Sequence, residues 1–317
     1  MKVLVKTICG SSLYGTAIES SDQDFKVIFL PDLEDMIRFK VDRIKVFSTG
    51  NKHKKNGSQD VDIEFIEVRR FLELVEQGQT SALETIFTPD EFIIEKDPLW
   101  DEIRQQARHL FCKKTEHIIG YMNSQILKFE RQREKMLILE QNIEALERIV
   151  NEFGDKVTLS DIDTNVIHLE SFQPSDRDIL TSKKLKTNLH TKTPIAQMLK
   201  KSLHPMMKKL QSSNENFDMK TIMHAIRIGQ EGLEFLLAEK ITLPRPNANI
   251  LLDIRNGIID ETKAFEMAKD TVQALTTAKA STSLPERGNF ESLDSFLDEM
   301  YCRHLEDCLR QSSPKSA

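Results

Sequence analysis

The chain has few cysteines, and they are not spaced as metal sites or redox motifs require. The four of them, Cys9, Cys112, Cys302 and Cys308, are spread over 317 residues with no C-x-x-C pair. Neither a zinc site nor a disulfide framework is therefore indicated. We expect reduced thiols, which fits a cytoplasmic protein.

Long apolar runs are also missing. No window approaches eighteen uncharged apolar residues, and residues 1–9 lack the apolar core and the cleavage site of a signal peptide. We therefore expect no membrane partner and a location in the cytoplasm. The net charge of −6 argues against a protein that coats nucleic acid with its whole surface, so any site for a polyanion must be local.

The residues that are present predict two kinds of structure in succession. Residues 2–9, 25–30 and 61–68 have the apolar or alternating pattern of β-strands, and the apolar spacing after residue 68 is typical of helices. An apolar content of 39% supports about two domains. We predict an α+β fold with a small mixed sheet in residues 1–110 and a larger helical domain in residues 111–317. The second domain would carry a lysine-rich insertion at about 150–215.

Two aspartates stand at the entrance of the second predicted strand. Asp22 and Asp24 are separated by one residue, so their side chains leave an extended backbone on the same side. Mg²⁺ prefers carboxylate oxygens and binds through them together with substrate phosphates. Gly10 and Ser11, upstream, offer a close backbone approach, amides and a hydroxyl for phosphate oxygens.

A third carboxylate is needed if this is a nucleotidyl-transfer site. Such sites hold two metal ions about 4 Å apart and use a further acid toward the attacking hydroxyl. The third predicted strand supplies candidates on one face by its period of two, namely Asp60, Asp62 and Glu64. The spacing leaves all three open, and two of the three are expected to form a solvated strand face.

Further cations could contact a triphosphate. Lys113 and Lys114 precede a long predicted helix, and Arg227 shares a helix face with His224 three residues earlier. The alternatives are two solvated lysines and an arginine that pairs with a neighbouring acid. Glu84, in a short apolar helix, is either a site residue or an exposed helix residue.

A lysine-rich segment lies between Asp178 and Glu215, where there is no acidic residue. Its eight lysines include Lys200, Lys201, Lys208 and Lys209. Such a patch can hold an RNA or DNA backbone by releasing counterions. The segment has no aromatic residues on which bases could stack, so we do not expect it to read sequence. The alternative is a solvated basic loop.

The motifs together resemble the signature of the DNA polymerase β nucleotidyltransferase superfamily. Gly10-Ser11, Tyr14-Gly15 and Ser21-Asp22-x-Asp24 carry the resemblance. Other stretches are similar to the RlaP-type family associated with RNA repair, namely VRRFLELVEQGQTSALETIF (68–87), GYMNSQ (120–125), HAIRIGQEGLEFLLAEKITLPRP (224–246), ILLDIRNG (250–257) and SLPE (283–286). The resemblance implies a sheet that carries the active site and a helical domain that closes over nucleotide.

The resemblance also implies an activity and its residues. Gly10 and Ser11 would bind phosphate, Asp22 and Asp24 would bind two Mg²⁺ ions (or Mn²⁺), and Asp62 would be the third carboxylate by its distance from Phe71. The expected reaction transfers a nucleoside monophosphate from NTP, with ATP expected, to a hydroxyl of RNA or another nucleic acid. Two alternatives remain: an antitoxin-like protein AMP-transferase, and a catalytically silent nucleotide- or nucleic-acid-binding partner.

Overall fold

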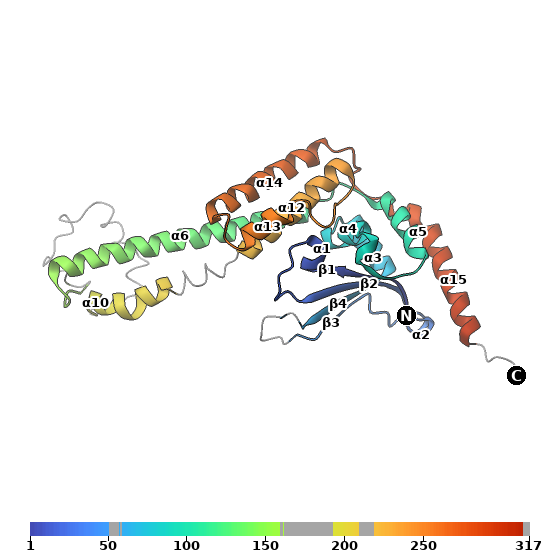
Figure 1. Ribbon diagram of the computed structural model, residues 1–317, viewed down its shortest axis with the longest axis horizontal. Helices are drawn as coiled ribbons and strands as arrows, with labels where there is room; N and C mark the ends of the chain where they lie inside the picture. The colour runs from blue at the N-terminus through green and yellow to red at the C-terminus, as the bar shows by residue number, and fades with distance from the viewer. Residues whose placement is uncertain (51–56, 58, 159–160, 162–192, 209–218, 313–317) are drawn as a thin grey trace. The chain divides into compact units, whose positions relative to one another are not determined.

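The computed structural model describes residues 1–50, 57, 59–158, 161, 193–208 and 219–312 (Figure 1). The chain forms two compact units, the first made of Met1–Asn123 with Ile222–Ala317 and the second of Ser124–Thr221. An N-terminal mixed sheet with helices is followed by a mostly helical region, which confirms the predicted α+β class. The domain boundary expected at residue 110 stays a prediction.

The first unit contains a five-stranded sheet with the order β3-β4-β2-β1-β5. The strands are β1 (Lys2–Cys9), β2 (Gln23–Leu30), β3 (Ile44–Ser48), β4 (Val61–Glu67) and β5 (Ile93–Lys96). β2 and β4 are parallel neighbours, and the other pairs are antiparallel. The three predicted strands are therefore present, and two short edge strands are added to them.

Short helices lie between the strands or follow the last of them, and the third and fourth in chain order lie over one face of the sheet (Figure 1). They are α1 (Gly10–Tyr14), α2 (Leu33–Ile37), α3 (Val68–Glu76), α4 (Thr80–Phe87) and α5 (Leu99–Gln106). The core of this layer is fully buried and joins Ile28 and Ile66 of the sheet to Phe71 of α3 and Trp100 of α5. Burying a side chain of this size contributes about 1.5–3 kcal/mol, so this core holds the central strands firmly in place.

The C-terminal half of the first unit is helical. Its elements are α12 (Met219–Ala238), α13 (Ala248–Arg255), α14 (Glu261–Ser281) and α15 (Asp294–Ser312). A Cβ on Gly229 of α12 would overlap Met122 of the long helix α6 (Glu116–Phe153) and lie 2.7 Å from Cγ2 of Thr271 on α14. The absent side chain thus lets the three helices pack closely.

The second unit has a separate apolar core. Leu146 and Ile149 of α6 pack with Ile195 and Met198 of α10 (Ile195–Met198) and with Leu203 of the following π-helical turn, Leu199–Leu203. Among the described residues, no helix is long and apolar enough to cross a membrane. The four cysteines all lie in the described part of the chain, and no disulfide joins them there.

Candidate active site

Three carboxylates meet where β2 and β4 begin. Asp24 of β2 and Asp62 of β4 are directly opposite each other in the parallel register, and Asp22 immediately precedes β2. Each contributes an oxygen, and these oxygens all lie within 4.8 Å of one another. The three side chains are half-buried. Three hard oxygen donors at this spacing form the kind of group that holds a divalent cation in contact with solvent or substrate.

Gly10 closes one side of this carboxylate cluster. Its φ is +66°, a conformation that favours glycine, and a Cβ at this position would overlap the carboxylate of Asp24, whose Cγ would be 2.8 Å away. Ser11 follows on α1, and its carbonyl accepts a hydrogen bond from the amide of Thr16 at 2.9 Å. Gly10, the first residue of the predicted phosphate-binding pair, therefore lies directly beside Asp24.

The register separates the three candidates for the third acid. The carboxylate of Asp60 accepts a hydrogen bond from the amide of Gly57 at 2.8 Å, and its carbonyl accepts one from the amide of Gln23 at 3.0 Å. Glu64 forms an ion pair with Lys26 at 3.3 Å. Only Asp62, of these three, belongs to the carboxylate cluster found in the described part of the chain.

Lys26 and Cys9 also line this region, and the sequence interpretation did not single them out. Lys26 is buried on β2, and its ammonium donates to the carbonyl of Ser81 at 3.2 Å. The period of two places it on the face of Asp24, which is the signal that could have identified it. Cys9 is the cross-strand partner of Asp24, and burial raises the pKa of its thiol to about 12. Lys26 therefore brings a positive charge close to the acids, whereas Cys9 is neutral.

The two lysines predicted to bind nucleotide each have an acidic partner. Lys113 pairs with Glu286 at 2.8 Å, and Lys114 pairs with Glu76. Both lysines are half-buried. A part in nucleotide binding stays a prediction for each of them.

Arg227 lies inside the protein, with only 5% of the residue exposed. Its Nη1 pairs with Glu84 at 2.7 Å and with Glu231 at 2.8 Å. This is the pairing with acids that was the alternative to nucleotide binding, and the nucleotide assignment stays a prediction. Glu84, considered as an exposed helix residue, is instead buried. The partnership of Arg227 with Glu84 joins residues far apart in the chain, so no local pattern reveals it.

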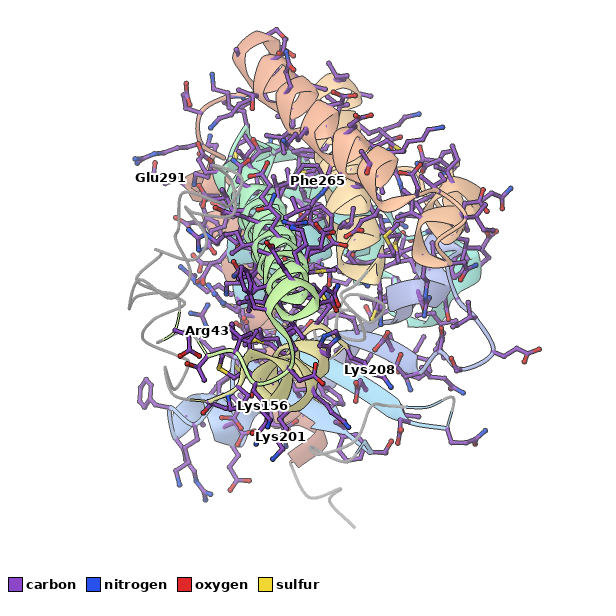
Figure 2. The ribbon with its side chains drawn as sticks, turned by 90° about the vertical axis from the view of Figure 1, so that its left-hand side faces the viewer. Arg43, Lys156, Lys201, Lys208, Phe265 and Glu291 are labelled. Atoms are coloured by element: carbon purple, nitrogen blue, oxygen red, sulfur yellow. The ribbon has the colours of Figure 1, made fainter. Side chains whose placement is uncertain are left out.

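The basic segment is described only in part. Lys200, Lys201 and Lys208 are exposed, and Lys201 and Lys208 are labelled in Figure 2. Lys209 and the four lysines from 183 to 192 lie outside the described residues. A role in binding nucleic acid stays a prediction for the segment.

Comparison with known proteins gives a relative that matches almost the whole chain and a family that matches the part containing the sheet. An uncharacterized 38.9 kDa protein from the nrdC-mobD intergenic region of enterobacteria phage T4 is 24% identical over 328 residues. The match covers 95% of this chain and 97% of the phage protein. The family model of RlaP, described as an RNA repair pathway DNA polymerase beta family, matches residues 1–140, as the sequence predicts, and these residues contain the carboxylate cluster.

Proposed function

We propose that the protein is a Mg²⁺-dependent nucleotidyltransferase that moves a nucleoside monophosphate from NTP to a hydroxyl acceptor. The observation that carries this proposal is the convergence of Asp22, Asp24 and Asp62 beside Gly10 and Ser11. A DNA polymerase beta family match over the residues that form this site supports the same reaction.

The residues of the cluster suit Mg²⁺. They are all carboxylates, they come from two adjacent strand starts, and Gly10 leaves the space beside Asp24 free of a side chain. Carboxylates this close repel one another, and a bound cation removes that repulsion. Bound Mg²⁺ would polarise the phosphate and lower the pKa of the attacking hydroxyl. Asp22 and Asp24 would hold the ions, with Asp62 completing the set.

The protein groups would bind the phosphates and accept the proton of the attacking hydroxyl. The amides of Gly10 and Ser11 and the Ser11 hydroxyl would hold phosphate oxygens of the NTP. Asp62 would accept the proton of the acceptor hydroxyl as its oxygen bonds to the α-phosphorus. The bond from that phosphorus to the α,β-bridging oxygen would break, and pyrophosphate would leave with that oxygen. Positioning and electrostatics would supply most of the rate enhancement.

We propose ATP as the nucleotide and RNA as the acceptor. The family description names an RNA repair pathway, and the exposed Lys200, Lys201 and Lys208 would attract a polyanion. The test is to incubate the protein with each of the four α-labelled NTPs and with total RNA, DNA or cell protein. The nucleotide that transfers label and the fraction that receives it identify both substrates. Label in protein alone would instead favour the AMP-transferase alternative.

The metal cluster can be tested by stability. Mg²⁺ with ATP should raise the melting temperature of the parent, because a ligand at about 100 times its Kd stabilises by about 2.7 kcal/mol. The double variant Asp22→Asn, Asp24→Asn should fold and lose that increase. A matched control, Glu91→Gln with Glu95→Gln, removes the same charge at two exposed acids of the same unit. This control should still show the increase in melting temperature with Mg²⁺ and ATP. An equal increase in the aspartate variant would refute the metal cluster.

A further inference from the structure

A buried polar cluster lies under α1. The Tyr14 hydroxyl donates to Oε2 of Glu84 at 2.7 Å, and the guanidinium of Arg227 stacks 3.6 Å from the centre of the Tyr14 ring. Arg227 in turn donates to Glu84 and to both oxygens of Glu231. All four residues are less than a tenth exposed. The cluster therefore joins α1 to α4 and α12 with little contact with bulk water.

The charges of this cluster balance when one proton is retained. Burial raises the pKa of Glu231 well above its ordinary value. Burial acts in the same direction on Glu84, but the Arg227 guanidinium and hydrogen bonds from its neighbours, Glu231 among them, lower its pKa below the ordinary value. A neutral Glu231 hydrogen-bonded to a charged Glu84 leaves one carboxylate facing one guanidinium. The Tyr14 hydroxyl thus has a charged acceptor, which makes its hydrogen bond a strong one.

The segment that follows Tyr14 is also held by residues from the C-terminal half. The amide of Arg245 donates to the carbonyl of Tyr14 at 3.1 Å, and Nη1 of Arg255 donates to the carbonyl of Thr16 at 2.9 Å. A Cβ on Gly15 would be 3.3 Å from side-chain carbons of Pro244 and Ala248. The C-terminal end of α1 is therefore fixed closely on several sides.

The other end of α1 is the phosphate side of the site. Gly10 lies against Asp24 with no room for a side chain. Since α1 is only five residues long, a shift at Tyr14 would be transmitted to Gly10 and Ser11. The carboxylates of Asp22, Asp24 and Asp62 come from β2, its entrance and β4, so they do not depend on α1 for their placement.

We propose that Tyr14, held by Glu84 and Arg227, is a positioning residue that sets Gly10 and Ser11 at the distance from the carboxylates that a metal-bound triphosphate requires. This inference deepens the proposed function and rests on it. The inference predicts different effects on two affinities. Loss of the Tyr14 hydroxyl should weaken triphosphate binding and leave metal binding unchanged.

The test is Tyr14→Phe, which keeps the ring under Arg227 and removes only the hydroxyl. Titration calorimetry with α,β-methylene-ATP and Mg²⁺ should show a Kd about tenfold higher than in the parent, the scale of one hydrogen bond. Mn²⁺ alone, followed by electron spin resonance, should bind within twofold of the parent. An unchanged nucleotide Kd would overturn the proposal, as would an equal loss of Mn²⁺ affinity.

A matched control removes a hydroxyl from another tyrosine that is bound to a buried glutamate. Tyr301 donates to Glu67, in the same unit and away from α1, so Tyr301→Phe should leave both affinities within twofold of the parent. If Tyr301→Phe weakens nucleotide binding as much as Tyr14→Phe does, the effect is general destabilisation and the proposal fails.

A second variant separates position from stability. Glu84→Gln keeps an oxygen for the Tyr14 hydroxyl but removes the charge beside Arg227. We expect a lower melting temperature and a nucleotide Kd raised about threefold, less than in Tyr14→Phe, because the hydrogen bond to Tyr14 is weakened but kept. A Kd raised by more than in Tyr14→Phe would mean that the Kd follows lost stability and not the lost hydroxyl, and would overturn the proposal.

If the parent itself binds no nucleotide, the proposed function fails, and with it the role in triphosphate binding. Amide hydrogen exchange then tests only whether Tyr14 anchors α1. Faster exchange at residues 10–16 in Tyr14→Phe, absent in Tyr301→Phe, would retain Tyr14 as the anchor of α1, and unchanged exchange would remove that as well.

Discussion

At the scale of single residues, the candidate site depends on which face each acid occupies. Asp60, Asp62 and Glu64 alternate along one stretch of the chain; this pattern reduces the third carboxylate only to this set, and the family resemblance favours Asp62 within it. The pairing of β2 with β4 selects Asp62, because it places Asp62 directly opposite Asp24. Asp60 holds the Gly57 amide instead. The choice depends on a strand pairing that links distant parts of the chain, so it could not be made from local pattern.

Replacing Asp62 and replacing Asp60 should therefore have very different effects on the rate of nucleotidyl transfer. Asp62→Asn should lower the single-turnover transfer rate by about two orders of magnitude or more, because it removes the carboxylate that accepts the proton and completes the metal set. Nucleotide binding, measured by calorimetry, should persist. Asp60→Asn should reduce the rate by less than about threefold, the effect of one altered turn hydrogen bond. The opposite ranking would show that Asp60 is the catalytic acid.

At the scale of elements, the sequence predicted the central strands and the long helices, and the short edge strands were missed. The predicted strands at 2–9, 25–30 and 61–68 correspond closely to Lys2–Cys9, Gln23–Leu30 and Val61–Glu67. All five residues of β3 are exposed, and β5 has only four residues, so neither has the apolar alternation that burial imposes. Such edge strands are defined by their neighbours.

The basic helical segment is an element whose two faces differ. Ile195, Leu199 and Leu203 are buried in the core of the second unit, while Lys200, Lys201 and Lys208 are exposed. The lysines are therefore available to a partner on a surface whose backbone is fixed by packing. A polynucleotide is the partner that the charge favours.

If the acceptor is RNA, replacing Lys200, Lys201, Lys208 and Lys209 with alanine should weaken its binding at low salt. Each lost phosphate contact should reduce the slope of log K against log salt by about 0.7 to 0.9. Fluorescence anisotropy with a labelled single-stranded RNA across a salt series measures this slope. Lys240→Ala with Lys263→Ala, at two exposed lysines of the first unit, is the control and should leave it unchanged. An unaltered slope in the quadruple variant would exclude this segment as the RNA site.

At the scale of the whole molecule, residues from the N-terminal and C-terminal halves of the chain share one buried charge cluster. Glu231 is surrounded by Arg227, Glu84 and Arg245, and its pKa is raised in the folded protein. A sequence shows Glu231 only as an acid one helical turn after an arginine. Its burial, and therefore its protonation, depends on packing between elements that are distant in the chain.

This raised pKa predicts how stability changes with pH. The folded state keeps a proton that the unfolded state releases above the ordinary pKa of glutamate, so the stabilisation is complete below that value and is lost as pH rises toward the folded pKa. Glu231→Gln, a neutral mimic, should match the parent near pH 4. It should become more stable than the parent by up to about 1.4 kcal/mol for each pH unit above that.

Thermal unfolding of both proteins from pH 4 to pH 9 measures the difference. Glu84→Gln is the control, because it removes the charged partner of Arg227 and should be less stable than the parent at neutral pH. A stability difference between Glu231→Gln and the parent that does not change with pH would contradict a retained proton on Glu231.

The parallel pairing of β2 and β4 also determines when the site can form. Parallel neighbours cannot be joined by a tight hairpin, so the chain leaves β2, passes through α2 and β3, and returns before Asp62 reaches Asp24. Closing such a loop is a slow, entropically opposed event in folding. A partly folded chain would therefore lack the three-acid set. The first binding of a divalent cation during refolding would report when β2 and β4 pair.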